Sequence, residues 1–248
     1  MSKGLGLFKV PGFAYPGGKV RLRKWLVSMM PRKGRRFVDL FAGRGNVSWL
    51  AMCALGFQEW WLNDIYTKPF FDAIRDVDVA DLPFKFTRDW ARDAKKGTSA
   101  LEIVLSPWMS YSGGTVGGIS RCTLYHSSRY KKTIQNAKRI LRARSPTITA
   151  LDWTDVLGSG LCSDDFVYLD PPYMNASAGY AVDTVDHADL LRALKQTSAR
   201  WLLSGYESEL YLRELGAPSA SRLSAIYMKT AHGEGSKPPR LECVWKNY

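Results

Sequence analysis

Two short apolar runs separated by a helical pattern, between residues 36 and 64, constrain the fold most. RFVDL (36–40) predicts a buried strand, FAGRGN (41–46) a turn, VSWLAMCALG (47–56) a helix that stops at its last glycine, and FQEWWLND (57–64) a second strand. Parallel strands need a crossover helix of this kind between them. The segment therefore predicts a βαβ unit of an α/β sheet.

The rest of the chain continues this alternation after one interruption. Residues 65–81 look helical, whereas the pattern loosens over 82–145, where two Gly-Gly pairs (113–114 and 117–118) precede a basic helical stretch, 131–144. DFVYLD (165–170), residues 199–206 and residues 240–248 predict further strands, and Asp186 is suited to cap a helix. We expect one doubly wound α/β domain, mostly parallel with an antiparallel strand near the C-terminus, that carries an insertion at 82–145.

Basic charge is concentrated in two stretches of a chain whose formal net charge is +12. Neither 19–36 nor 121–144 contains an acidic residue. The first holds Lys19, Arg21, Arg23, Lys24, Arg32, Lys33, Arg35 and Arg36; the second holds Arg121, Arg129, Lys131, Lys132, Lys138, Arg139, Arg142 and Arg144. Such density favours a polyanionic partner, and thus nucleic acid, over the alternatives of a solvated face or a membrane surface.

The cysteines and the N-terminus argue against other classes of protein. Cys53, Cys122, Cys162 and Cys243 are widely spaced and form no CxxC pair, so we expect neither a metal site nor a disulfide framework. No apolar run is long enough to span a membrane, and MSKGLGLFKVPG lacks the apolar core of a signal peptide. We therefore expect a cytoplasmic protein.

The turn after the first strand has the composition of a nucleoside-binding loop. Gly43 and Gly45 allow the backbone to approach a ligand, and Asp64, at the end of the second strand, can accept hydrogen bonds from ribose hydroxyls. Asp39 suits a cationic ligand such as S-adenosylmethionine better than a pyrophosphate. A tight structural turn without a ligand remains the alternative.

The most specific local motif is Asp170-Pro171-Pro172-Tyr173, which follows the strand DFVYLD. The Asp170 carboxylate and the Pro171 carbonyl can accept the two hydrogens of an adenine amino group and direct its lone pair toward a methyl donor. The prolines fix the carbonyl, and Tyr173 can stack on the base. The alternative is again a purely structural turn.

FAYPGGK, FVDLFAGRGN, WLND and VYLDPPY, in this order, resemble the D12-class (Dam-like) N6-adenine DNA methyltransferases of bacteria and their phages. The resemblance covers both ends of the chain but not its middle. It implies residues 1–81 as the cofactor-binding part, 82–145 as the target-recognition insertion and 146–248 as the catalytic part. It also implies that Asp170 to Tyr173 hold a flipped adenine and that the S-adenosylmethionine site includes Tyr15, Gly17, Gly18, Lys19, Asp39, Phe41, Gly43, Asp64, Asp152, Trp153 and Asp170.

Double-stranded DNA is the expected partner, bound without a metal and in an oligomeric state that the sequence leaves open. Candidate DNA contacts are Arg121, Arg129, Lys131, Lys132, Lys138 and Arg139. We expect the basic helix to contact phosphates, while Arg121 reads bases beside Trp108, Tyr111 and Tyr125. The alternative is that the stretch containing Arg121 and these aromatic residues is a loop that merely covers the site.

Three other functions remain open at this point. An RNA adenine methyltransferase would share the chemistry and differ only in its substrate. Glutamine or cytosine-N4 methylation is disfavoured, because related motifs there begin with Asn or Ser where this chain has Asp170. A non-catalytic DNA-binding protein on the same fold would not need both motifs intact.

Overall fold

The main sheet has seven strands, and their order in space differs from their order in the chain. The computed structural model describes residues 9–83, 85–94, 97–109, 125–173, 185–224 and 240–248. From one edge to the other the strands are β5 (Thr147–Thr149), β2 (Gly56–Asn63), β1 (Lys33–Asp39), β6 (Phe166–Leu169), β7 (Arg200–Gly205), β9 (Arg240–Lys246) and β8 (Ala220–Ser224).

The strand directions confirm the predicted sheet. β5, β2, β1, β6 and β7 pair in parallel, whereas β9 runs antiparallel to both β7 and β8. The order reverses at β1 and β6, since the chain first moves outward to β2 and later returns to the other side of β1. In such sheets, ligands bind beyond the carboxyl ends of the strands at that reversal.

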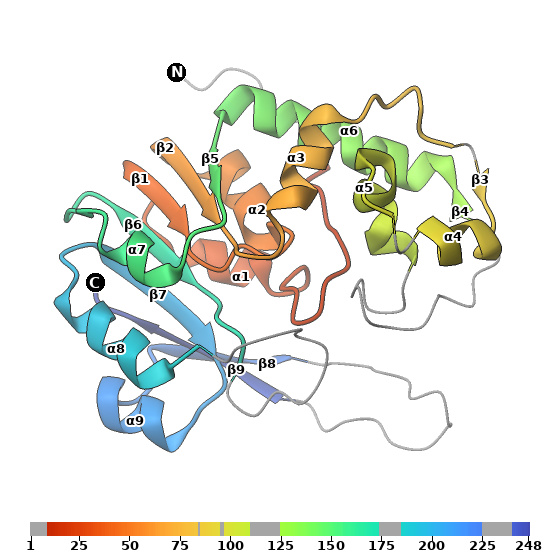
Figure 1. Cartoon of the computed structure of the whole chain (residues 1–248). Helices are drawn as coiled ribbons and strands as arrows, with labels where there is room; N and C mark the ends of the chain where they lie inside the picture. Colours follow the sequence, from red (N-terminus) through yellow and green to blue (C-terminus); the bar gives the residue numbers. More distant parts are fainter. Residues whose placement is uncertain (1–8, 84, 95–96, 110–124, 174–184, 225–239) are drawn as a thin grey trace, which may run out of the picture.

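Alternate residues of the strands face two separate apolar layers, as expected of a sheet covered on both faces. Phe37, Trp60 and Phe166 contribute to one buried cluster, and Val38 and Val167 to the other. The first layer contains α1 (Arg23–Ser28), α2 (Asn46–Ala54) and α3 (Lys68–Asp76). The second contains α7 (Trp153–Leu157), α8 (His187–Gln196) and α9 (Glu209–Leu215), as Figure 1 shows.

Several predicted boundaries need correction. α3 is shorter than the helix expected over 65–81, because the chain first makes a turn after Asp64 and leaves the helix at Val77. The sequence also did not predict α9 or β8. The helix capped by Asp186 is confirmed, since Oδ1 of Asp186 accepts hydrogen bonds from the backbone amides of Ala188 and Asp189.

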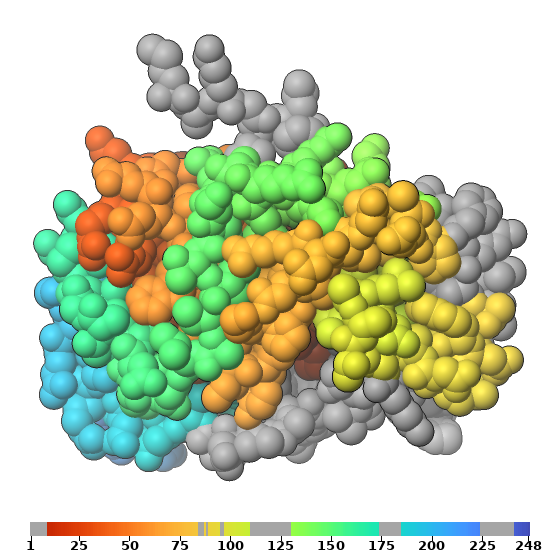
Figure 2. All heavy atoms as spheres, turned by 45° about the horizontal axis from the view of Figure 1, so that its top comes forward, coloured from red at the N-terminus to blue at the C-terminus, as the bar shows by residue number. Residues whose placement is uncertain are grey.

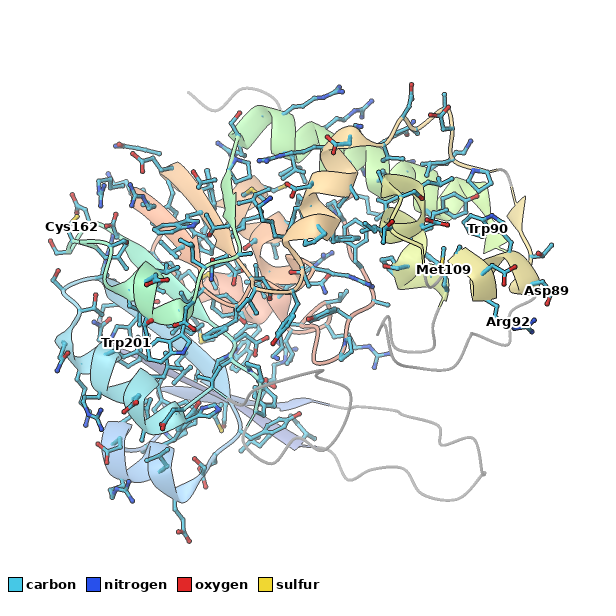
Figure 3. All side chains as sticks on the ribbon, in the orientation of Figure 1. Asp89, Trp90, Arg92, Met109, Cys162 and Trp201 are labelled. Carbon is cyan, nitrogen blue, oxygen red and sulfur yellow. The ribbon has the colours of Figure 1, made fainter. Side chains whose placement is uncertain are left out.

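The segment 82–145 contains more regular structure than its loose pattern suggested. It forms β3 (Lys85–Phe86), α4 (Arg88–Ala94), α5 (Ala100–Met109), β4 (Tyr125–His126) and α6 (Ser127–Arg144), with β3 and β4 antiparallel. Trp90 and Met109 mark the α4–α5 part in Figure 3, at the side of the molecule opposite Trp201. α6 begins before the predicted residue 131, and its outer side lies on the molecular surface next to α3 (Figure 2).

Trp108, which was expected beside the base-reading Arg121, is partly buried and packs against the core. Its ring centroid lies 5.7 Å from that of Phe13 and 5.9 Å from that of Tyr130. Ile134 and Ile140 of α6 join the same apolar cluster as Phe37 of the sheet. The described part of 82–145 thus packs continuously onto the first layer of helices.

Candidate active site

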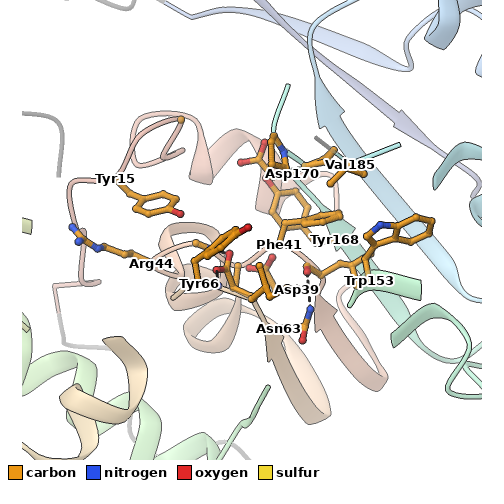
Figure 4. A pocket seen from close by; sticks show the side chains of 18 of the residues that line it. Tyr15, Asp39, Phe41, Arg44, Asn63, Tyr66, Trp153, Tyr168, Asp170 and Val185 are labelled. Atoms are coloured by element: carbon orange, nitrogen blue, oxygen red, sulfur yellow. Dashed lines mark hydrogen bonds between the residues drawn. The ribbon is translucent and has the colours of Figure 1, made fainter. Parts of the chain in front are cut away.

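A cavity of about 320 Å³ opens at the carboxyl ends of β1, β2 and β6, where the strand order reverses. Its volume is within the range of small-molecule sites. Figure 4 shows Tyr15 and Arg44 on one side, Trp153 on the other and Asp170 between them. All of the predicted cofactor and catalytic residues line it: Tyr15, Gly17, Gly18, Lys19, Asp39, Phe41, Gly43, Asp64, Asp152, Trp153, Asp170, Pro171, Pro172 and Tyr173.

The glycine turn brings backbone close to the N-terminal segment. Gly43 has a φ of +51°, and a Cβ there would lie 2.9 Å from the Tyr15 ring. The turn therefore requires glycine for two reasons, its left-handed backbone and its contact with an aromatic side chain. Gly45, with a φ of +69°, precedes α2 and lets the chain enter that helix.

Two polar side chains from this turn hold the N-terminal segment against α2. Asn46 accepts a hydrogen bond from the Phe13 amide and donates one to the Phe13 carbonyl, both at 2.9 Å. Arg44 donates to the Ala14 carbonyl at 2.6 Å and to Ser106 at 2.8 Å, and burial lowers its pKa to about 10. Asn46 and Arg44 were not among the predicted site residues, although both lie in the motif FVDLFAGRGN.

Asp39 ends β1 with its carboxyl group almost completely buried at 1% exposure. Ser48 donates a hydrogen bond to Oδ2, whereas Oδ1 has no hydrogen bond of normal geometry. Desolvation raises the pKa of Asp39 to about 8, against smaller opposing effects of Ser48 and the Phe41 backbone. Because the group lines the cavity, a cationic ligand would favour its charged form.

Asp64 organises the loop that follows β2. Its Oδ2 accepts a hydrogen bond from the Gly43 amide at 2.8 Å, and its Oδ1 accepts from the amides of Tyr66 at 2.9 Å and Thr67 at 2.7 Å. Each carboxylate oxygen has more than one acceptor position. The predicted bond to a ribose hydroxyl would therefore add to a structural role that the sequence did not reveal.

Asp152 and Trp153 lie at the start of α7 on the cavity wall. Oδ1 of Asp152 caps that helix by accepting hydrogen bonds from the amide and hydroxyl of Thr154, at 2.9 and 2.6 Å. The Trp153 side chain is half-buried. The cap fixes where Trp153 enters the cavity wall (Figure 4).

Lys19 and Asp170, which both line the cavity, form an ion pair. The Lys19 ammonium is 2.8 Å from each carboxylate oxygen of Asp170 and 2.9 Å from the Gly17 carbonyl. The exposed fractions of the two side chains are 5% and 17%. Lys19, which the resemblance assigned to the cofactor, is therefore in direct contact with the residue expected to hold the adenine.

Glu242 of β9 completes this group, and the sequence analysis did not identify it. Its side chain is 2% exposed, accepts a hydrogen bond from the Tyr173 hydroxyl at 2.6 Å, and lies 3.7 Å from the Lys19 ammonium. Burial raises the pKa of Glu242 to about 7, although Lys19 opposes this effect. The available signal was a carboxylate flanked by the apolar residues Leu241, Cys243 and Val244 of a predicted strand, because charges are rarely buried without a partner.

The Tyr173 ring is flanked by other side chains. Its centroid lies 4.3 Å from that of Tyr206 and 4.7 Å from the Lys19 ammonium. The hydroxyl also reaches Oδ1 of Asp170 at 3.2 Å. Tyr173 therefore links Asp170 to Glu242 as well as lining the cavity.

His187 holds the turn of the DPPY motif from behind. Its Nε2 lies 2.9 Å from the Pro172 carbonyl, and its Nδ1 lies 2.7 Å from the Tyr211 hydroxyl. Since a carbonyl only accepts, Nε2 carries a proton. Burial lowers the pKa of His187, so the ring is neutral near pH 7 and Nδ1 accepts from Tyr211. No local pattern in the sequence predicts this contact.

The predicted DNA contacts on α6 differ in their surroundings. Lys132 and Arg139 are exposed and Lys131 is half-buried. Lys138 instead donates from its ammonium group to the Arg75 carbonyl at 2.8 Å and to the Val77 carbonyl, so it caps the end of α3. Arg121, together with Tyr111, lies outside the described residues, as do the side chains of Tyr125 and Arg129.

The first basic stretch divides into four residues that are buried or half-buried and four exposed residues, Arg21, Lys24, Arg32 and Lys33. Lys19 is buried at the cavity, and Arg23 donates to the Val10 carbonyl at 3.2 Å. Arg35 pairs with Asp165, and Arg36 pairs with Glu59 at 2.7 Å. Because β1 begins at Lys33 and the cavity lies beyond Asp39, the two arginines of β1 lie toward the far end of the strand.

The described residues contain neither a membrane-spanning helix nor a metal-binding group of side chains. No helix there is long and apolar enough to cross a membrane. Within the same residues, no group of three or more His, Cys, Asp or Glu side chains is arranged to hold a metal ion.

Comparisons with known proteins match the N-terminal part of this site. Residues 15–88 match the family model described as D12 class N6 adenine-specific DNA methyltransferase. A search of curated proteins finds no match. Among solved structures, a conserved hypothetical protein from Streptococcus pyogenes aligns with 14% sequence identity over 91% of this chain and 95% of that chain, with a TM-score of 0.38.

Proposed function

We propose that this protein, a D12 class N6 adenine-specific DNA methyltransferase by the family match over residues 15–88, uses S-adenosylmethionine as its methyl donor. The family match supports methylation of adenine N6 in DNA. The cofactor assignment rests on one cavity, which is lined by both the buried carboxyl group of Asp39 and the DPPY turn.

The cavity fits the charges of S-adenosylmethionine. Oδ1 of Asp39 is a buried acceptor without a normal hydrogen bond, as expected of a carboxylate that receives a cationic group. Asp64 offers acceptors for ribose hydroxyls, and Gly43, which has no side chain, would let the ligand approach the backbone closely. Tyr15, Phe41 and Trp153 supply the aromatic surface on which the nucleoside would rest.

The DPPY turn would hold the target amino group. Asp170 accepts one amino hydrogen and the Pro171 carbonyl accepts the other, which directs the nitrogen lone pair into the cavity. S-adenosylmethionine, when bound, supplies an electrophilic methyl group. The Asp170 carboxylate would favour the positive charge that develops on N6 as the methyl group passes from sulfur to nitrogen. The methylated nitrogen would then lose one hydrogen to water as a proton and become neutral again.

The target adenine must leave the duplex to reach this cavity, because its amino group is otherwise within the base stack. Lys131, Lys132 and Arg139 on the outer side of α6 are the described side chains that we propose to contact phosphates. The proposed recognition insertion remains 82–145, including Arg121 and Arg129. Action on DNA suits a protein of the bacterial or phage-infected cytoplasm.

Transfer of a tritiated methyl group to matched DNA and RNA of mixed sequence tests the proposal. We expect transfer to DNA, and a loss of roughly 10²- to 10³-fold in Asp170→Ala, the usual size for removing a group that stabilises charge in the transition state. Cofactor affinity should be largely retained. Asp155→Ala, an exposed position on α7, is the matched control. Transfer to RNA alone would favour the RNA enzyme, and near-wild-type turnover of Asp170→Ala would contradict the mechanism.

A further inference from the structure

Lys19 occupies the acceptor that the target adenine needs. Its ammonium group bonds to both oxygens of Asp170 and to the Gly17 carbonyl, which uses all three of its hydrogens. Oδ1 of Asp170 also lies within reach of the hydroxyls of Tyr173 and Ser204, at 3.2 and 3.3 Å. Oδ2 is therefore the better acceptor for an amino hydrogen, and Lys19 is bonded to it.

A lysine that stayed on Asp170 would hinder the reaction in two ways. It would weaken the carboxylate as an acceptor, because the ammonium already neutralises its charge. It would also place a positive charge beside N6 as that atom becomes positive during transfer, and like charges repel strongly in a site with little water. Lys19 must therefore move away from Asp170 for transfer to be efficient.

Glu242 lies where it can receive the lysine. Its Oε1 is 3.7 Å from the Lys19 ammonium, against 2.8 Å for the oxygens of Asp170. Shortening that distance to a normal charged hydrogen bond needs a movement of about 1 Å. The Tyr173 hydroxyl already donates to the same carboxylate, so Glu242 is held in place by a residue of the DPPY turn.

We propose that Glu242 is a positioning residue that takes Lys19 from Asp170 when the adenine amino group arrives. The inference rests on the proposed function, since it concerns the same site and reaction. In the free protein Lys19 neutralises Asp170, and in the DNA complex it neutralises Glu242. One buried ammonium thus serves two carboxylates in turn, the partly buried Asp170 and the buried Glu242.

The ionisation of Glu242 gives this exchange a dependence on pH. The groups that face it are Lys19 and Asp170, the hydroxyls of Tyr173 and Tyr168, and Arg222 at the opposite register position on β8. Only the charged carboxylate can receive the lysine. With a pKa raised to about 7, activity should rise with pH through that value and then level off.

The test compares Glu242→Gln with wild-type protein at saturating cofactor. We expect kcat on DNA to fall about tenfold or more, the size expected for losing a hydrogen bond to a charged group. Cofactor affinity should be unchanged, and the rise of activity near pH 7 should disappear. Glu242→Asp should restore part of both. Glu214→Gln is the control, because Glu214 also pairs with a lysine, Lys195, but at the surface.

A second background separates positioning from mere packing. The Lys19→Gln variant has no lysine to transfer, so adding Glu242→Gln to it should cause no further loss of kcat. In that background the second substitution removes a buried charge that lacks its partner. Equal losses in both backgrounds would mean that Glu242 acts only through Tyr173 and would overturn the inference. Wild-type turnover and pH profile in Glu242→Gln would also overturn it. Wild-type protein that methylates no DNA would instead refute the proposed function.

Discussion

Ser48 donates a hydrogen bond to one oxygen of Asp39, while the other oxygen is buried in the cavity wall without a hydrogen bond of normal geometry. The two residues come from β1 and α2, which the glycine turn connects. Desolvation raises the pKa of Asp39 to about 8. The raised pKa favours the protonated form of this carboxyl group in the free protein.

Cofactor binding should release a proton from Asp39. Because a cationic ligand favours the carboxylate, its affinity should rise as pH increases toward 8, by up to about tenfold per pH unit. Calorimetry at pH 7 in two buffers of different ionisation enthalpy measures the protons released. Asp39→Asn should lose that release, and the difference between the two proteins removes the contribution of the cofactor's own amino group. Equal proton release by both would contradict the assignment.

The same shift predicts how the stability of the free protein changes with pH. Between about pH 4 and 8 the folded state holds a proton on Asp39 that the unfolded chain has lost, so this group makes the free energy of unfolding fall as pH rises. In Asp39→Asn the free energy of unfolding should fall less between pH 5 and 8 than it does in the wild-type protein. Urea unfolding of both proteins at pH 5 and 8 checks it, and an unchanged difference between the two proteins would count against the raised pKa.

Asp64→Ala should weaken cofactor binding and loosen the loop after β2 together. The carboxylate accepts hydrogen bonds from the amides of Gly43, Tyr66 and Thr67, all of which the substitution removes. Calorimetry should show a loss of affinity of at least about tenfold, and thermal unfolding a lower Tm. Asp64→Asn keeps one acceptor oxygen, so its cofactor affinity and Tm should lie between those of the wild-type protein and the alanine variant. Unchanged cofactor affinity in the alanine variant would remove Asp64 from the site.

His187→Ala should lower turnover without weakening cofactor binding, since the ring holds the Pro172 carbonyl next to the proposed adenine acceptor Pro171. The loss should be roughly two- to tenfold, as for one neutral hydrogen bond. Tyr211→Phe keeps the bond to Pro172 and serves as the comparison, with a smaller effect. An equal effect of both variants would mean that packing, not the carbonyl contact, matters.

Neutralising Lys131, Lys132 and Arg139 together should reduce the slope of log affinity for DNA against log salt by roughly 2 to 3, at about 0.9 per phosphate contact. Lys132 and Arg139 are exposed on α6 and Lys131 is half-buried, and Lys138 is left in place because it caps α3. Neutralising Arg192, Lys195 and Arg213 on α8 and α9, across the sheet, is the matched control. An unchanged slope in the α6 variant would show that its charges are merely solvated.

Local pattern in the sequence was enough to predict five of the seven strands, β1, β2, β6, β7 and β9, while most of the residues that line the cavity were predicted from the family resemblance. The apolar periods of β1, β2, β6 and β7 mark buried parallel strands, and such strands bring their carboxyl ends to one edge. Asp39, Asp64 and Asp170 follow or end those strands, so their meeting at one site follows from topology. The glycine turn and the DPPY turn were recognisable because their backbone demands restrict residue choice.

Contacts between distant segments required the tertiary structure. Lys19 and Asp170 are 151 positions apart, and Tyr173 and Glu242 are 69 apart. No local period encodes such pairs. A buried charge is stable only with a partner, and the fold alone decides which partner it meets. For the same reason Trp108 packs against the core and Lys138 caps a helix, because packing of α5 and α6 onto α3 determined their surroundings.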